Sequence, residues 1–115
     1  MGKGQSFFLT KTAEFERVRK KGSAIRNLFF TMVYSTSKQA GFSRIGVIAG
    51  RRVGNAVKRN RLKRVCRELV RGSITSILPG YECILYPKTR MLQASFGEVK
   101  RVWNEMLNEI GLISK

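Results

Sequence analysis

The segment from Arg51 to Arg71 constrains this chain more than any other, because it combines two patterns in one stretch. Between Arg51 and Arg67 it carries eight basic residues and no acidic one. Its apolar residues recur at helical spacing, and at about 100° per residue they fall on one side of a helix. They are Leu62, Val65, Cys66, Leu69 and Val70. The segment therefore predicts one helix that buries an apolar face in a core and presents cations on the other face.

The ends of this helix carry residues suited to capping. Gly54 and Asn55 predict a turn and an N-cap, since the Asn side chain can accept a hydrogen bond from an N–H group of the first turn. Gly72 and Ser73 suit the C-terminal end. The face opposite the apolar one carries Asn60, Arg64, Arg67 and Arg71.

These cations have two interpretations. A solvated face is the simpler one, because Lys and Arg are the usual exposed residues of surface helices. Ordinary solvated helices mix both signs of charge, however, and cations without a carboxylate repel one another in the free protein. We therefore favour a polyanion-binding face, which matches the basic stripe of nucleic-acid-binding proteins.

The whole chain is basic as well. Its 115 residues suffice for one domain with one core, and a hydrophobic content of 43% favours a folded protein. The net charge of +16 and the pI of about 11.0 imply a polyanionic partner, nucleic acid first and an anionic membrane surface second. The sequence has no apolar run near the ~20 residues that span a bilayer and no signal-peptide core. We expect a cytoplasmic protein.

The residue types that are missing argue against catalysis by the protein itself. The chain has no His and no Asp, which excludes a Ser-His-Asp triad, a His base and a His-ligated metal. Metal-dependent nucleases need clustered carboxylates, whereas Glu14 and Glu16 are two apart on a predicted helix and do not share a face. Cys66 and Cys83 lie in apolar patterns, so we expect buried thiols without a disulfide or a zinc site.

The other predicted elements alternate between helix and strand. In chain order they are a frayed end (1–9), a helix from Thr10 or Thr12 to about Lys21, a strand over 23–36 bent near Arg26 and Asn27, a strand over 43–50, the central helix, a strand over 81–86 and a helix opened by Ser95. This order, α-β-β-(β)-α-β-α, predicts one α+β domain over residues 1–115, built as a two-layer α-β sandwich.

Two of these elements carry further patterns. The last helix has an apolar face, typical of a core helix, made of Phe96, Val99, Trp103, Met106, Leu107 and Ile110. In the strand over 43–50, Gly46 lies on the side opposite Ile45 and Val47. A small residue there allows another backbone or a ligand to approach the sheet closely.

The central segment closely resembles the signature of a known family. GNAVKRNRLKR at residues 54–64, after a strand that ends in two basic residues, resembles the bacterial ribonuclease P protein subunit. The resemblance extends over most of the chain. It includes EFERVRKKG (14–22), a strand that reaches Tyr34, RIGVIAGRR (44–52) and a Pro-basic turn (87–90).

This resemblance implies a fold and a function. The implied fold is an α-β sandwich whose βαβ crossover is left-handed, although about 98% of such crossovers are right-handed. In the family the catalytic subunit is an RNA, which binds the divalent metal ions (Mg²⁺) and cleaves precursor tRNA at its 5′ end. The protein helps to hold that RNA and binds the 5′ leader in a cleft between the sheet and the first helix. We therefore expect no cofactor on the protein alone, no membrane and no obligate protein partner.

The resemblance also implies two sets of site residues. Residues that would face the catalytic RNA are Lys58, Arg59, Asn60, Arg61, Lys63, Arg64 and Arg67. Residues that would line the leader cleft are Phe15, Arg19, Tyr34, Arg51, Arg52, Lys88 and Arg90. Arg binds phosphates through its planar fork, and aromatic rings stack on unpaired bases. Family members often carry a second aromatic residue one helical turn after the first, where this chain has Arg19.

Alternatives remain open at this stage. The same charge and fold would serve a non-enzymatic ribosomal or structured-RNA-binding protein, and only the motif argues against that function. A membrane-surface helix is less favoured, because the apolar face of residues 62–70 contains no Trp or Phe anchor. Phe15 is either a core residue or an open ring beside a groove floored by Gly46 and Ala49 and rimmed by Arg51 and Arg52.

Overall fold

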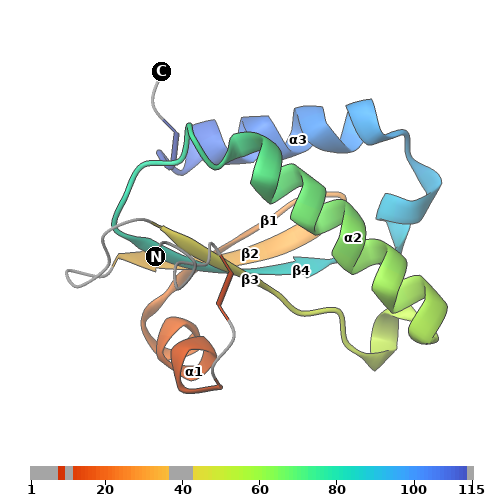
Figure 1. Ribbon diagram of the computed structural model, residues 1–115, viewed down its shortest axis with the longest axis horizontal. Coiled ribbons are helices and arrows are strands. Elements are labelled where there is room, and N and C mark those ends of the chain that lie inside the picture. Colours follow the sequence, from red (N-terminus) through yellow and green to blue (C-terminus); the bar gives the residue numbers. More distant parts are fainter. Residues whose placement is uncertain (1–7, 10–11, 37–42, 114–115) are drawn as a thin grey trace, which may run out of the picture.

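A computed structural model describes residues 8–9, 12–36 and 43–113 of the chain. Four strands form one mixed sheet in the order β1-β2-β4-β3, with α2 and α3 over one face and α1 over part of the other (Figure 1). The elements are α1 (Thr12–Lys21), β1 (Ser23–Arg26), β2 (Phe30–Thr36), β3 (Arg44–Val47), η2 (Arg51–Val53), α2 (Ala56–Ser73), β4 (Tyr81–Pro87), η3 (Thr89–Gln93) and α3 (Phe96–Glu109). The α+β class and the element order are confirmed. α1 adds a partial layer to the main sandwich.

The segment over residues 23–36, predicted as a strand bent near Arg26 and Asn27, forms two strands, because the chain turns back at Asn27 and makes a hairpin. The second of them accounts for the optional third strand of the predicted order. The Asn27 side-chain oxygen accepts hydrogen bonds from the backbone N–H groups of Phe29 (2.9 Å) and Phe30 (3.1 Å). An Asn side chain that binds the backbone two residues on replaces part of the backbone pairing of a tight turn. β1 and β2 are therefore antiparallel neighbours, with Arg26 opposite Thr31.

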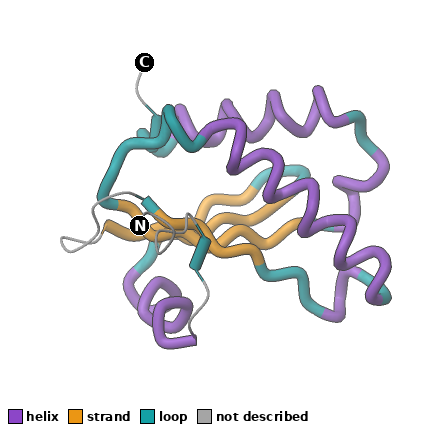
Figure 2. Tube along the Cα trace, viewed as in Figure 1, coloured by secondary structure: helices purple, strands orange, loops and turns teal. Residues whose placement is uncertain are grey.

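The connection from β3 through α2 to β4 joins two adjacent parallel strands. In Figure 1 both strands run in the same direction, β3 lies nearer the viewer than β4, and α2 returns above them. The chain thus turns counter-clockwise while it recedes from the viewer, which makes the crossover left-handed. Both 3₁₀ segments, η2 and η3, lie beyond the C-terminal ends of these strands, at one end of the sheet (Figure 2).

The main core lies between the sheet and the two long helices. The expected apolar face of α2 is confirmed, since Leu62, Cys66, Leu69 and Val70 are buried and Val65 packs against them. Trp103 of α3 is fully buried, meets the Phe30 ring edge-to-face at 5.9 Å, and donates its indole N–H to the Ser73 hydroxyl at 2.9 Å. A buried indole needs such a partner, and this one fixes α3 against the last turn of α2.

Three local expectations need correction. Gly72 lies inside α2, which continues to Ser73 and has Ile74 as its C-cap. Phe96 does not join the core face of α3, because it lies in the first turn and its side chain is 47% exposed. Residues 1–7 lie outside the described part of the chain, but Phe8 bridges to Ile45 and Leu9 is buried, so these two are not frayed.

Both cysteines are buried thiols, as expected, and burial raises the pKa of each to about 12 from an ordinary value of 9.0. Below pH 9 the two thiols keep their protons in both the folded and the unfolded chain. Between pH 9 and 12 only the unfolded thiol loses it, so the free energy of unfolding falls by about 1.4 kcal/mol per pH unit per thiol.

We predict that urea unfolding measured at several pH values between 8 and 10.5 will show this loss of stability in the parent protein. A variant with Cys66→Ala and Cys83→Ala should start less stable, because packing is lost, but should lose stability less steeply with rising pH. Parallel pH curves for parent and variant would contradict the prediction.

Candidate nucleic-acid interface

The outer face of α2 presents a row of cations to solvent. Asn55 is the N-cap, as predicted, and its side chain accepts a hydrogen bond from the Lys58 backbone N–H at 3.0 Å. The cations and the amide expected to face RNA are exposed except for Arg59 and Lys63, which are half-buried. The exposed residues are Lys58, Asn60, Arg61, Arg64 and Arg67.

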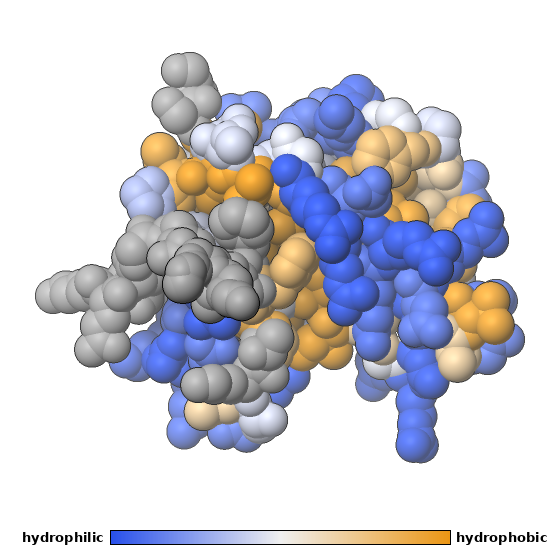
Figure 3. Space-filling model, viewed as in Figure 1, coloured by the Kyte–Doolittle hydropathy of each residue, from blue (hydrophilic) through white to orange (hydrophobic). Residues whose placement is uncertain are grey.

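Among the described residues, no carboxylate forms an ion pair with a cation of this face, although Glu68 of α2 is exposed one helical turn after Arg64. Within the described ranges the ion pairs are Arg17–Glu82, Arg44–Glu14 and Arg101–Glu105, and none involves a residue of α2. Figure 3 shows hydrophilic residues gathered along the course of this helix. Unpaired cations on one rigid helix repel one another unless an external polyanion approaches, so the arrangement favours a phosphate backbone as partner.

A second candidate surface lies on the opposite face of the sheet, where α1 packs. Val18 is fully buried against Ile84, and the Phe15 ring lies directly over Gly46. A Cβ atom on Gly46 would stand 2.3 Å from Cε1 of Phe15. The small residue therefore admits the Phe15 ring and not a ligand, and the expected groove floor at Gly46 is closed. Phe15 itself is half-buried, which lies between the two alternatives of a buried core residue and an open ring.

Two ion pairs hold α1 in this position. The Arg17 guanidinium makes two hydrogen bonds to the Glu82 carboxylate, at 3.1 and 2.6 Å, and the Glu82 side chain is only 6% exposed. Arg44 of β3 pairs with Glu14 of α1. A bidentate guanidinium–carboxylate pair fixes orientation as well as distance, so α1 is oriented on the sheet from both sides of Phe15.

α1 covers only one end of this sheet face. Along β4, the residues that face α1 are Glu82 and Ile84, which are buried, and then Tyr86, which is half-buried. Val33 and Ile48, also on this face, are half-buried too. Figure 3 shows the surface hollowed between α1 and the segment that leads to η2. We name the part of the sheet formed by Val33, Ile48 and Tyr86, with α1 beside it, the α1 groove.

The expected cleft residues divide between two faces of the sheet. Phe15 and Arg19 lie on α1 beside the groove, but Tyr34 packs against the main core on the other face. There it lines a recess of about 400 Å³ together with Tyr81 and Ile110. Because successive strand residues point to opposite faces, it is Val33 that faces α1. The prediction that Tyr34 shares a cleft with Phe15 is therefore wrong in its geometry.

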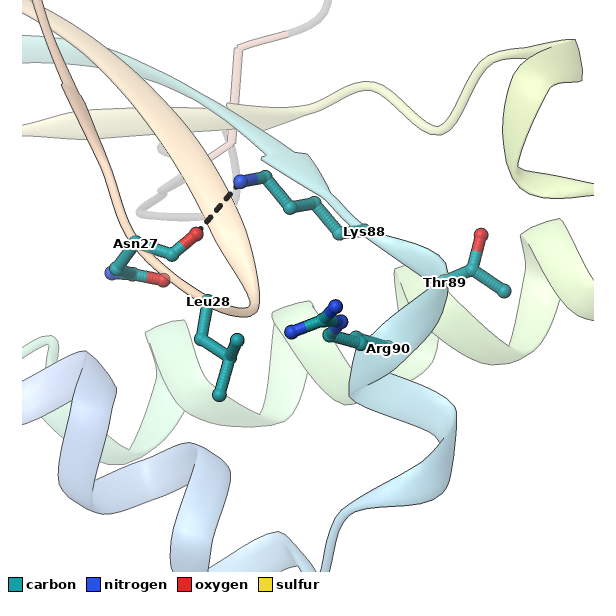
Figure 4. A pocket seen from close by; sticks show the side chains of 5 residues that line it. All are labelled: Asn27, Leu28, Lys88, Thr89 and Arg90. Atoms are coloured by element: carbon teal, nitrogen blue, oxygen red, sulfur yellow. Dashed lines mark hydrogen bonds between the residues drawn. The ribbon is translucent and has the colours of Figure 1, made fainter.

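The basic residues of the cleft gather beyond the strand ends. Arg51 and Arg52 are exposed in η2, just after β3, where Ile48 still pairs with Leu85. Lys88 follows β4, and its amino group donates to the backbone oxygen of Asn27 at 2.7 Å (Figure 4).

Arg90 stands apart from the groove. It lines a recess of about 510 Å³ with Leu28, and in Figure 4 its side chain lies on the side of the long helices. All four basic residues thus follow the C-terminal ends of β3 and β4, but the Arg90 side chain lies toward the long helices, in a recess that Lys88 also lines.

Comparison with known proteins identifies the family. The model of the family described as Ribonuclease P matches residues 4–111. The chain belongs to the Ribonuclease P protein family. Among curated relatives, the Ribonuclease P protein component of Mesoplasma florum is 33% identical over 101 residues, covering 86% of this chain and 90% of the relative. That of Chloroflexus aggregans is 31% identical over 107 residues, covering 92% and 78%.

Solved structures show that the fold is shared. The RNase P protein of Staphylococcus aureus superposes with a TM-score of 0.84 at 24% identity, over 96% of this chain and 100% of that one. The RNase P protein of Thermotoga maritima gives a TM-score of 0.78 at 24% identity, over 89% and 96%. In the described part of this Ribonuclease P family chain, no three His, Cys, Asp or Glu side chains cluster as a metal site would require. None of its described helices is long and apolar enough to span a bilayer.

We predict that Gly46→Ala destabilises the protein by about 1–3 kcal/mol, because the added methyl group collides with the Phe15 ring and the core must shift. Gly50→Ala is the matched control, since a Cβ there meets nothing within 4 Å and should change stability by less than about 0.5 kcal/mol. Urea unfolding of both variants checks this. Equal losses in the two variants would show that Phe15 does not rest on Gly46 in solution.

Proposed function

We propose that this chain is the protein subunit of a ribonuclease P that matures the 5′ end of tRNA. In this proposal the cation face of α2 binds the catalytic RNA and the α1 groove binds the 5′ leader of precursor tRNA. The family membership supports the assembly. The observation that carries the residue assignment is the row of exposed α2 cations with no carboxylate partner among the described residues.

We assign the cleavage itself to the RNA partner and place the divalent metal ions, Mg²⁺ above all, in that RNA. The residue chemistry of the protein supports this division of work. It has neither His nor Asp, and its acids are seven Glu. Two of these, Glu14 and Glu82, already hold α1 through arginine, which leaves them poorly placed for proton transfer. The protein then contributes charge neutralisation and substrate positioning.

Reconstitution tests this function directly. The purified protein is added to a bacterial ribonuclease P RNA, and cleavage of a precursor tRNA is followed at a low Mg²⁺ concentration, at which RNA self-repulsion is strongest. We expect the protein to increase cleavage and to shift the RNA's Mg²⁺ requirement downward. A protein that binds ribosomal RNA fragments tightly but leaves cleavage unchanged would support the alternative of a structured-RNA-binding protein.

We also predict that replacing Arg61 and Arg64 together by Ala weakens binding to the catalytic RNA. The helix should persist, because both side chains are exposed and Ala is the better helix former. The slope of log affinity against log salt should become shallower by about 0.9 per lost phosphate contact, as measured by filter binding at several salt concentrations.

The matched control for this double variant is Arg101→Ala on α3. Arg101 is also an exposed helical arginine, but its guanidinium is paired with Glu105 at 2.9 Å. The Arg101→Ala variant should therefore keep nearly the same RNA affinity and the same slope of log affinity against log salt as the parent protein. Equal effects of the two variants would mean that net charge alone, and not the α2 face, determines binding.

A further inference from the structure

Tyr86 occupies a position in the α1 groove that the sequence motifs do not single out. It is the last α1-facing residue of β4 before Pro87, and it packs in one cluster with Phe15, Val33 and Ile48. Its two predecessors on that face, Glu82 and Ile84, are covered by α1, whereas Tyr86 is half-buried. The groove therefore has an aromatic side chain on its floor in addition to the one that α1 contributes.

The hydroxyl of Tyr86 also has a partner on α1. Arg19 donates from Nε to this oxygen at 3.1 Å, one helical turn after Phe15. No other described residue pairs with the guanidinium, so its two terminal nitrogens are free to bind a phosphate end-on. The contact holds an exposed cation at the lip of the groove, where an unanchored arginine would sample many rotamers.

From this arrangement we propose that Tyr86 and Arg19 form one contact unit for single-stranded RNA, in which Tyr86 stacks on a leader base and Arg19 binds the adjoining phosphate. The proposal rests on the proposed function, because the strand it assigns to the groove is the 5′ leader of precursor tRNA. It adds a floor residue, and it assigns Arg19 a phosphate contact and not a stacking role.

The chemistry of the surroundings identifies the occupant as a nucleic-acid single strand. A groove with aromatic side chains along its length and cations at its rim is the usual design for such strands, since every base has a π-face and every linkage a charge. Arg51 and Arg52 continue the positive rim beyond the strand ends. The chain's charge of +16 also disfavours a cationic ligand here.

The competing explanation is that Tyr86 is simply a packing residue. Binding of a precursor tRNA with a leader of about ten nucleotides, relative to mature tRNA, separates the two explanations when it is measured with the reconstituted RNA–protein complex. Under our proposal Tyr86→Leu keeps apolar volume but removes the ring, and it should lower this affinity ratio by about tenfold. Tyr34→Leu, which alters a half-buried tyrosine on the opposite sheet face, should leave the ratio unchanged.

The role of Arg19 has its own readout. Arg19→Ala should lower the same ratio and reduce the salt dependence of leader binding by about 0.7 in log–log slope, the contribution of one phosphate in a single strand. Tyr86→Phe keeps the ring and fold but removes the oxygen that holds Arg19. If the two residues act together, Arg19→Ala costs less in the Tyr86→Phe background than in the parent, which a double-mutant cycle measures.

The outcomes are distinct. A parent complex with no preference for leader-bearing tRNA overturns the leader-binding part of the proposed function and this inference with it. A parent preference that survives Tyr86→Leu, or that falls equally in Tyr34→Leu, overturns this inference alone. Should Tyr86→Leu fail to fold, the cycle with Tyr86→Phe still decides, because strictly additive losses or an unchanged salt slope in Arg19→Ala would refute the joint contact.

Discussion

Burial of one face of α2 is the constraint on which the rest of this structure depends. Leu62, Cys66 and Leu69 can reach the core only if the opposite face, with its row of arginines and lysines, remains in water. The chain has 23 basic residues against 7 acidic ones, so pairing every cation within the molecule is impossible. The positive face is thus a direct result of how the core is filled. A polyanionic partner would relieve a repulsion that the folded protein cannot relieve by itself.

The scarce carboxylates are placed where they determine geometry. α1 contributes little apolar surface, with Val18 as its single buried residue within Thr12–Lys21. Its position on the sheet therefore depends on the pairs of Arg17 with Glu82 and of Arg44 with Glu14, and on the space above Gly46. The same contacts leave the end of β4 open beside α1. One short helix thus covers part of this sheet face and leaves the rest of it accessible.

Periodic sequence patterns correctly predicted the features that depend only on the spacing of nearby residues. The α2 and α3 faces, the caps at Asn55 and Ser95 and the buried thiols needed only residue type and helical period. Sheet faces are harder, because a shift of one residue in where a strand starts exchanges its two sides. Tyr34 was assigned to the cleft by the family resemblance alone, and its place in β2 turns it to the main core instead. The reversal at Asn27 was predicted only as a bend near Arg26 and Asn27, because β-branched and aromatic residues occur on both sides of it. Tyr86 was missed because YECILY is apolar throughout its middle and shows no alternation by which to assign its faces.

The left-handed β3-α2-β4 connection determines which face of the sheet α2 covers. With the same strand order and directions, the common right-handed path would carry α2 to the other side of the sheet. Its eighteen residues would then lie over Ile48 and Tyr86 and compete with α1 for space. The rare hand instead leaves the cation face of α2 and the α1 groove on opposite faces of one sheet, so that the two RNA segments of the proposed function would not obstruct each other.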